Sequence, residues 1–140
     1  MTINSVVIDT NVLISSILSP KGIPAKVVRH FIQHGRILFS LETYEEFNSR
    51  LWRPKFDPYI SIENRKAILL DFSNIAQWVE ISNEFKLSKD PDDDKFIEVA
   101  IKANADTLVS RDSDLTEIGS VKNIPIYTPS QCFKLIHVDH

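Results

Sequence analysis

The chain has 140 residues, 43% hydrophobic and 25% charged, a composition typical of a soluble globular protein with one domain over residues 1–140. Its single cysteine, Cys132, excludes an internal disulfide and a cysteine-rich zinc site. The 19 acids exceed the 16 lysines and arginines, for a net charge of −3, which argues against binding nucleic acid by bulk attraction.

Strand and helix patterns alternate along the chain. Short β-branched or apolar runs predict strands at 5–8, 37–39, 78–81, 107–110 and 124–127. Apolar residues at helical spacing predict helices at 11–18, 24–34, 41–52, 61–76, 92–103 and 129–136. Pro125 places the last strand at a sheet edge, because proline cannot donate to a ladder. The alternation predicts a three-layer α/β/α domain whose mostly parallel central sheet has about five strands.

Two acids directly follow predicted strands. Asp9 follows strand 5–8 and Asp112 follows strand 107–110. Ligands of parallel sheets bind outside the carboxyl ends of the strands, so both acids are expected at one rim. Glu46, in the helix after the second strand, is placed to lean over that rim. Asp94, in the first turn of helix 92–103, reaches it only if the preceding connection allows.

Each acid also has a structural explanation when it is taken singly. An aspartate after a strand is often a turn former or helix cap, as Asp9 and Asp112 would be. Acids in the first turn of a helix, such as Asp92, Asp93 and Asp94, complement its dipole. Only the convergence of these acids on one rim indicates function.

Four stretches of the chain carry a resemblance to a known family. Their positions and sequences are 6–13 (VVIDTNVL), 40–47 (SLETYEEF) with 51–56 (LWRPKF), 90–96 (DPDDDKF) followed by Ala100, and 108–115 (LVSRDSDL). In this order they resemble the four acidic motifs of PIN domains, in particular those of bacterial VapC-like toxins. The resemblance implies the PIN fold, ribonuclease activity, a homodimer, and the toxin role in a toxin–antitoxin pair with a cognate antitoxin protein.

Matched motif by motif, the resemblance implies a catalytic set of Asp9, Glu46, Asp94 and Asp112. Glu45 competes with Glu46 for the second position and Asp93 with Asp94 for the third, while Asp114 lies near the fourth. Asp9, Asp94 and Asp112 are the implied metal ligands. Asn11 and Ser110 match the polar residues that usually accompany the acids and would position them or their waters. Arg111 is a candidate phosphate contact because it adjoins Asp112.

Four carboxylates in one pocket repel each other unless a cation binds among them. A set of oxygen ligands without cysteine favours Mg²⁺ or Mn²⁺ over zinc. Such an ion activates water for cleavage of a phosphodiester bond, a reaction that does not itself require the RNA 2′-hydroxyl. The preference for single-stranded or looped RNA therefore comes from the resemblance.

Other interpretations of the chain are weaker or remain open. A phosphoacceptor receiver domain needs an acid pair after its first strand, and a haloacid-dehalogenase phosphatase needs a second aspartate where Asn11 stands. A PIN nuclease of RNA processing outside a toxin–antitoxin pair, or a non-catalytic PIN-like binding module, stays open. Without a signal peptide or an apolar run of about 18 residues, a cytoplasmic protein is expected.

Overall fold

The computed structural model describes residues 2–83 and 90–138. The strands are β1 (Ser5–Ile8), β2 (Arg36–Phe39), β3 (Gln77–Trp78), β4 (Thr107–Val109), β5 (Ser120–Val121) and β6 (Ile124–Tyr127). The helices are α1 (Thr10–Leu18), α2 (Ile23–His34), α3 (Leu41–Leu51), α4 (Ile62–Ile75), α5 (Pro91–Ala103), α6 (Ser113–Thr116) and α7 (Pro129–Val138), with a 3₁₀ turn at Pro54–Phe56. None of the described helices is long and apolar enough to cross a membrane.

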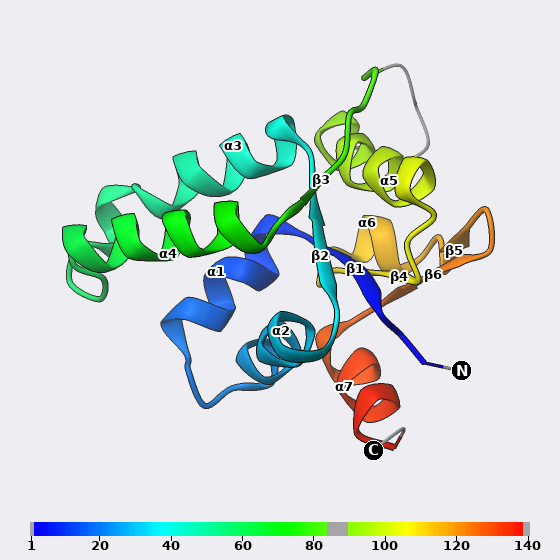
Figure 1. Cartoon of the computed structure of the whole chain (residues 1–140), viewed down its shortest axis with the longest axis horizontal. Coiled ribbons are helices and arrows are strands. Elements are labelled where there is room, and N and C mark those ends of the chain that lie inside the picture. Colours follow the sequence, from blue (N-terminus) through cyan, green and yellow to red (C-terminus); the bar gives the residue numbers. More distant parts are fainter. Residues whose placement is uncertain (1, 84–89, 139–140) are drawn as a thin grey trace.

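The strands form one sheet in the order β3-β2-β1-β4-β6-β5, in which only the β5–β6 pair is antiparallel. Figure 1 shows the helices arranged on both sides of this sheet. The predicted three-layer, mostly parallel α/β/α architecture is therefore confirmed. Because β1 lies between β2 and β4, its carboxyl end is at the centre of the rim.

Neighbouring residues of the strands face opposite sides of the sheet, as the pleat requires. Val6 and Ile8 of β1 pack into a core with α1, α2, α3, α4 and α7, whereas Val7 packs into a second core with α5 and α6. The cores include the large buried side chains Phe31 and Phe47 on the first side and Ile97 on the second. Consequently α3 and α5 approach the carboxyl rim from opposite faces.

Three details of the sheet differ from the sequence prediction. The strand predicted at 78–81 is the two-residue strand β3, Gln77–Trp78. The described part of the chain has six strands, because the two-residue strand β5 was too short for a periodic pattern to indicate. The prediction that the strand with Pro125 lies at an edge was wrong: β6 pairs with β4 on one side and β5 on the other, and β5 is the edge strand. The Pro125 carbonyl oxygen accepts a hydrogen bond from the Thr107 hydroxyl of β4 at 2.9 Å.

Candidate acidic active site

Asp9 anchors the site at the carboxyl end of β1. Its backbone N–H donates to the Val109 carbonyl at 3.0 Å, and its side chain caps α1 by accepting from the Val12 N–H at 2.9 Å. The Asp9 side chain is buried, at 6% exposure. The capping role that the sequence suggested is therefore real, and the same carboxylate also lines a cavity at the rim.

Ser110 connects Asp9 to Asp112. The Ser110 hydroxyl donates to the second carboxylate oxygen of Asp9 and accepts from the Asp112 backbone N–H at 2.9 Å. Ser110 is fully buried, and Asp112 caps the short helix α6 by accepting from the Asp114 N–H at 2.9 Å. One serine thus fixes the relative positions of two acids that follow adjacent strands.

Asp93 is one of two acids of α5 that line this cavity, the other being Asp92. It lines the cavity together with Asp9 and Asp112, and the volume of the cavity is about 160 Å³. Carboxylate oxygens of Asp93, Asp112 and Asp114 lie within 4.8 Å of one another. The sequence motifs indicated Asp93 only as the competitor of Asp94, and Asp114 only as a neighbour of the fourth acid.

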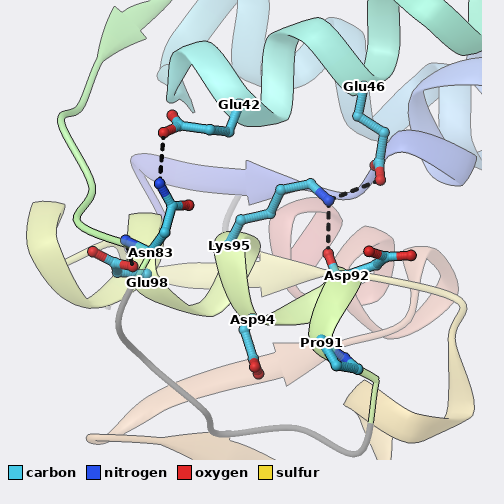
Figure 2. A pocket seen from close by; sticks show the side chains of 8 residues that line it. All are labelled: Glu42, Glu46, Asn83, Pro91, Asp92, Asp94, Lys95 and Glu98. Atoms are coloured by element: carbon cyan, nitrogen blue, oxygen red, sulfur yellow. Dashed lines mark hydrogen bonds and ion pairs between the residues drawn. The ribbon is translucent and has the colours of Figure 1, made fainter.

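Asp94 has a different orientation. It is buried at 8% exposure and lines the larger neighbouring cavity of about 520 Å³ between α3 and α5. In Figure 2 its carboxylate points away from the Glu46–Lys95 pair. The structure therefore does not bring Asp94 together with Asp9 and Asp112, although the family motif placed it there.

The electrostatics of the cavity fit a divalent cation. Burial, then the adjoining Asp112 carboxyl, raises the pKa of Asp93 to about 7. Burial likewise raises the pKa of Asp9, against the opposing effect of the Ser110 hydroxyl. Among the described residues, the buried Oδ2 atom of Asp93 has no hydrogen-bond partner. Clustered carboxylate oxygens with an unused buried acceptor are suited to a hard cation such as Mg²⁺ or Mn²⁺.

Glu46 reaches the cavity from α3, while Glu45 is solvent-exposed. One oxygen of the Glu46 carboxylate accepts from the Thr10 hydroxyl. The other contacts Lys95 Nζ at 2.9 Å and Arg50 Nη2 at 3.3 Å. Of the two glutamates that the motif left open, Glu46 is the one with access to the site.

The polar residues predicted to accompany the acids fall into two groups. Asn11 lines the acidic cavity and accepts from Arg50 Nη1 at 3.2 Å, and Ser110 supports the cavity from beneath through its bond to Asp9. Arg111 is exposed and directs its guanidinium toward the Ser15 hydroxyl at 3.4 Å. Arg111 is therefore adjacent to the acids in sequence but does not line their cavity.

Sequence reasoning missed two cations at the site, Arg50 and Lys95. The signal for Arg50 was present, since it follows Glu46 by four residues and so lies on the same helix face. Lys95 comes from a different helix, so only the packing of α3 against α5 brings it to Glu46.

Fold and cavity together define an α/β protein with an acidic site at the carboxyl end of a mostly parallel sheet. Residues 5–114 match the sequence model of the PIN domain, and the chain belongs to the PIN domain family. It is 34% identical over 115 residues to an uncharacterized protein of Methanocaldococcus jannaschii, a match that covers 81% of this chain and 74% of that protein.

Its fold is similar to that of a chain in the crystal structure of VapBC2 from Rickettsia felis bound to a DNA fragment from their promoter. The TM-score is 0.60 at 14% sequence identity, over 89% of this chain and 98% of that chain. PIN domains are generally nucleases and usually bind divalent metal ions. The acidic cavity is the part of this chain that is suited to both properties.

Proposed function

We propose that the protein is a Mg²⁺- or Mn²⁺-dependent endoribonuclease that hydrolyses RNA phosphodiester bonds. The observation that carries the proposal is the cluster of Asp93, Asp112 and Asp114 beside Asp9, with a buried carboxylate oxygen of Asp93 that has no hydrogen-bond partner among residues 2–83 and 90–138. In this proposal Asp93 takes the place that the motif resemblance implied for Asp94.

The aspartates at and beside the cavity would bind the metal ion. Asp93, Asp112 and Asp114 would hold the cation, and Asp9 would bind it or one of its waters. A bound cation supplies a Lewis acid that lowers the pKa of water and offsets charge on the phosphate. The Ser110 hydroxyl, through its bond to Asp9, favours the ionised form of that carboxylate and keeps it in position.

Glu46 has a role distinct from metal binding. Both of its carboxylate oxygens are engaged by side chains of the protein, namely Thr10, Lys95 and Arg50. A carboxylate so occupied is better suited to orient water or neighbouring side chains than to replace water on a cation. We therefore assign Glu46 to the edge of the site and the aspartates to its centre.

The proposal is tested by cleavage of a labelled single-stranded RNA by the wild type and the Asp9→Asn variant, with Mg²⁺ or with EDTA. Cleavage by the wild type should require the ion, and Asp9→Asn should cut at least about 100-fold more slowly because a central carboxylate is removed. Asp71→Asn, an exposed acid of α4, is the matched control and should cut like the wild type. Equal cleavage by Asp9→Asn, or indifference to EDTA, overturns the proposal. Single-stranded DNA of the same sequence tests the assignment to RNA.

We further infer that this nuclease is the toxin of a type II toxin–antitoxin pair. The similarity of the fold to a chain of VapBC2 and the resemblance of the four motifs to VapC-like toxins support the inference. A small open reading frame next to the gene should encode an antitoxin whose co-expression blocks cleavage and which co-purifies with the protein. If its product neither binds nor inhibits, the protein is a PIN nuclease of RNA processing or turnover.

A further inference from the structure

We propose that Lys95 and Arg50, held together by Glu46, form a phosphate-binding site for the backbone group next to the scissile one. The inference rests on the proposed nuclease function and names the residues that attract the substrate. It addresses a specific difficulty: the net charge of the chain is −3, and the cavity that must receive a polyanion is lined by acids.

The three side chains form one compact unit. Lys95 Nζ lies 2.9 Å and Arg50 Nη2 lies 3.3 Å from the same oxygen, Oε1 of Glu46. The exposed fraction of the side chain is 17% for Lys95, 28% for Arg50 and 16% for Glu46. Ion pairs at this depth are screened less by salt than exposed pairs. Glu46 therefore keeps two cations in place that would otherwise move freely.

The charges of this unit do not cancel. Two cations share one carboxylate, so the unit carries a net charge of +1. The other ionisable residues lining the acidic cavity are all aspartates, namely Asp9, Asp90, Asp92, Asp93 and Asp112. A bound cation would neutralise part of that charge at the scissile group. The adjacent phosphate needs a second positive group, and this unit supplies it.

The unit lies where that phosphate would fall. Glu46 lines both the acidic cavity and the larger cavity beside it. Arg50 is the only Lys or Arg among the described residues lining the first cavity, and Lys95 is the only one lining the second. Figure 2 shows the Lys95 side chain extended along the space between α3 and α5 toward Glu46. A strand leaving the acidic cavity in this direction passes both cations.

Both cations are oriented by contacts besides the one to Glu46. The Lys95 ammonium donates to the Asp92 carbonyl at 2.8 Å and contacts Glu46 at 2.9 Å. An ammonium has three N–H groups, so a third is left to donate to a phosphate. The Arg50 guanidinium donates to the Asn11 side chain through Nη1, so its two nitrogen ends connect α1 and α3. Pre-oriented donors bind phosphate with a smaller loss of side-chain entropy than mobile surface lysines.

The experiment measures binding of a fluorescent single-stranded RNA by anisotropy, with Ca²⁺ in place of Mg²⁺, over a series of salt concentrations. The variants are Lys95→Gln and Arg50→Gln, which lie on different helices. Lys95→Arg keeps the charge, and Lys102→Gln removes an exposed charge from the same helix as the matched control. Each Gln variant should bind about five- to tenfold more weakly near 0.1 M salt. The slope of log Kd against log salt should fall by about 0.7 for each phosphate that the variant no longer neutralises.

Further readouts separate phosphate binding from a structural role. Lys95→Arg should keep the wild-type slope, Lys102→Gln should stay within about twofold of the wild type, and Mn²⁺ affinity by calorimetry should be unchanged in all variants. With Mg²⁺, the Gln variants should be impaired in KM more than in kcat. Folding of every variant is checked by circular dichroism.

Two results would overturn the inference. One is that both folded Gln variants keep the wild-type affinity and salt slope. The other is that they bind Mn²⁺ more weakly, which would mean that these residues support the acids instead. Failure of the proposed function looks different, because the wild type would then not cleave RNA with Mg²⁺ or Mn²⁺, whatever the binding experiment gives.

Discussion

At the scale of single residues, the rotation of α5 about its own axis decides which of its aspartates faces Asp112. Consecutive residues of an α-helix point about 100° apart, and here Asp93 lines the acidic cavity while Asp94 lines the larger cavity beside it. The packing of Phe96, Ile97 and Ala100 into the core sets the rotation of α5 and turns Asp93 toward Asp112. Three consecutive aspartates carry no sequence signal for that rotation, and this is why the motif alone left the choice open.

Metal affinity should therefore distinguish the two neighbours. Asp93→Asn should weaken Mn²⁺ binding at least about tenfold, since it removes the negative charge of a ligand. Asp94→Asn should change the affinity less than about threefold. Isothermal calorimetry with MnCl₂ on the two folded variants measures both. A larger effect of Asp94→Asn would restore the assignment that the motif implied.

The raised pKa of Asp93 makes a prediction about stability without metal. The unfolded chain releases this proton near the ordinary value of 3.8, whereas the folded protein keeps it to about 7. Between these values the folded state binds more protons, so the stabilising contribution is present at low pH and is lost as pH rises from about 4 to about 7. Solvent screening in an open cavity limits the effect to about 1–2 kcal/mol.

Urea unfolding in EDTA at pH 5 and at pH 7.5 tests this prediction by comparing the wild type with Asp93→Asn. The wild type should lose more stability than the variant between the two pH values, because the variant has no carboxyl at this position. Asp9 contributes with the same sign, since burial raises its pKa too. Parallel pH profiles for the two proteins would contradict the assignment of the raised pKa to Asp93.

At the scale of elements, the sequence predicted best where local chemistry and packing agree. The alternation of strands and helices and the buried strand before Asp9 were both predictable from residue type and spacing. The expected strand at 78–81 is only Gln77–Trp78, since this short segment pairs with β2 alone. β5 was not predicted, because a strand of two residues forms only by pairing with its neighbour. Since β5 pairs with β6, β6 is not the edge strand.

Helix α3 carries both Glu46 and Arg50, so the hydrogen bonds that cap its first turn help to hold these two residues in place. The Ser40 hydroxyl accepts from the Thr43 N–H at 3.1 Å, and the Thr43 hydroxyl accepts from the Ser40 N–H at 3.0 Å. Ser40→Ala should therefore lower the free energy of unfolding by about 1–2 kcal/mol, because a buried N–H loses its acceptor. Ser49→Ala, an exposed change in the same helix, should stay within about 0.5 kcal/mol. Equal effects of both changes in urea unfolding would show that the cap contributes nothing.

At the scale of the whole molecule, the site is assembled from both faces of the sheet. Glu46 and Arg50 come from α3 on one face, and Asp93 and Lys95 from α5 on the other. Strand-end topology located Asp9 and Asp112 from the sequence, because both follow parallel strands directly. The helix-borne residues could not be located in this way, because their positions depend on which face each helix covers and on its rotation there.

The pairing of β1 with β4 also determines when this chain can acquire its acidic centre during synthesis. Ser110 follows Asp9 by 101 residues, and its hydroxyl holds the Asp9 carboxylate. Ribosomes add about 5–20 residues per second, so about 5–20 s separate the synthesis of these two residues. Throughout that interval the growing polypeptide carries Asp9 without Ser110 and Asp112. A protein that cleaves RNA would then be harmless to its own messenger until most of its translation is complete.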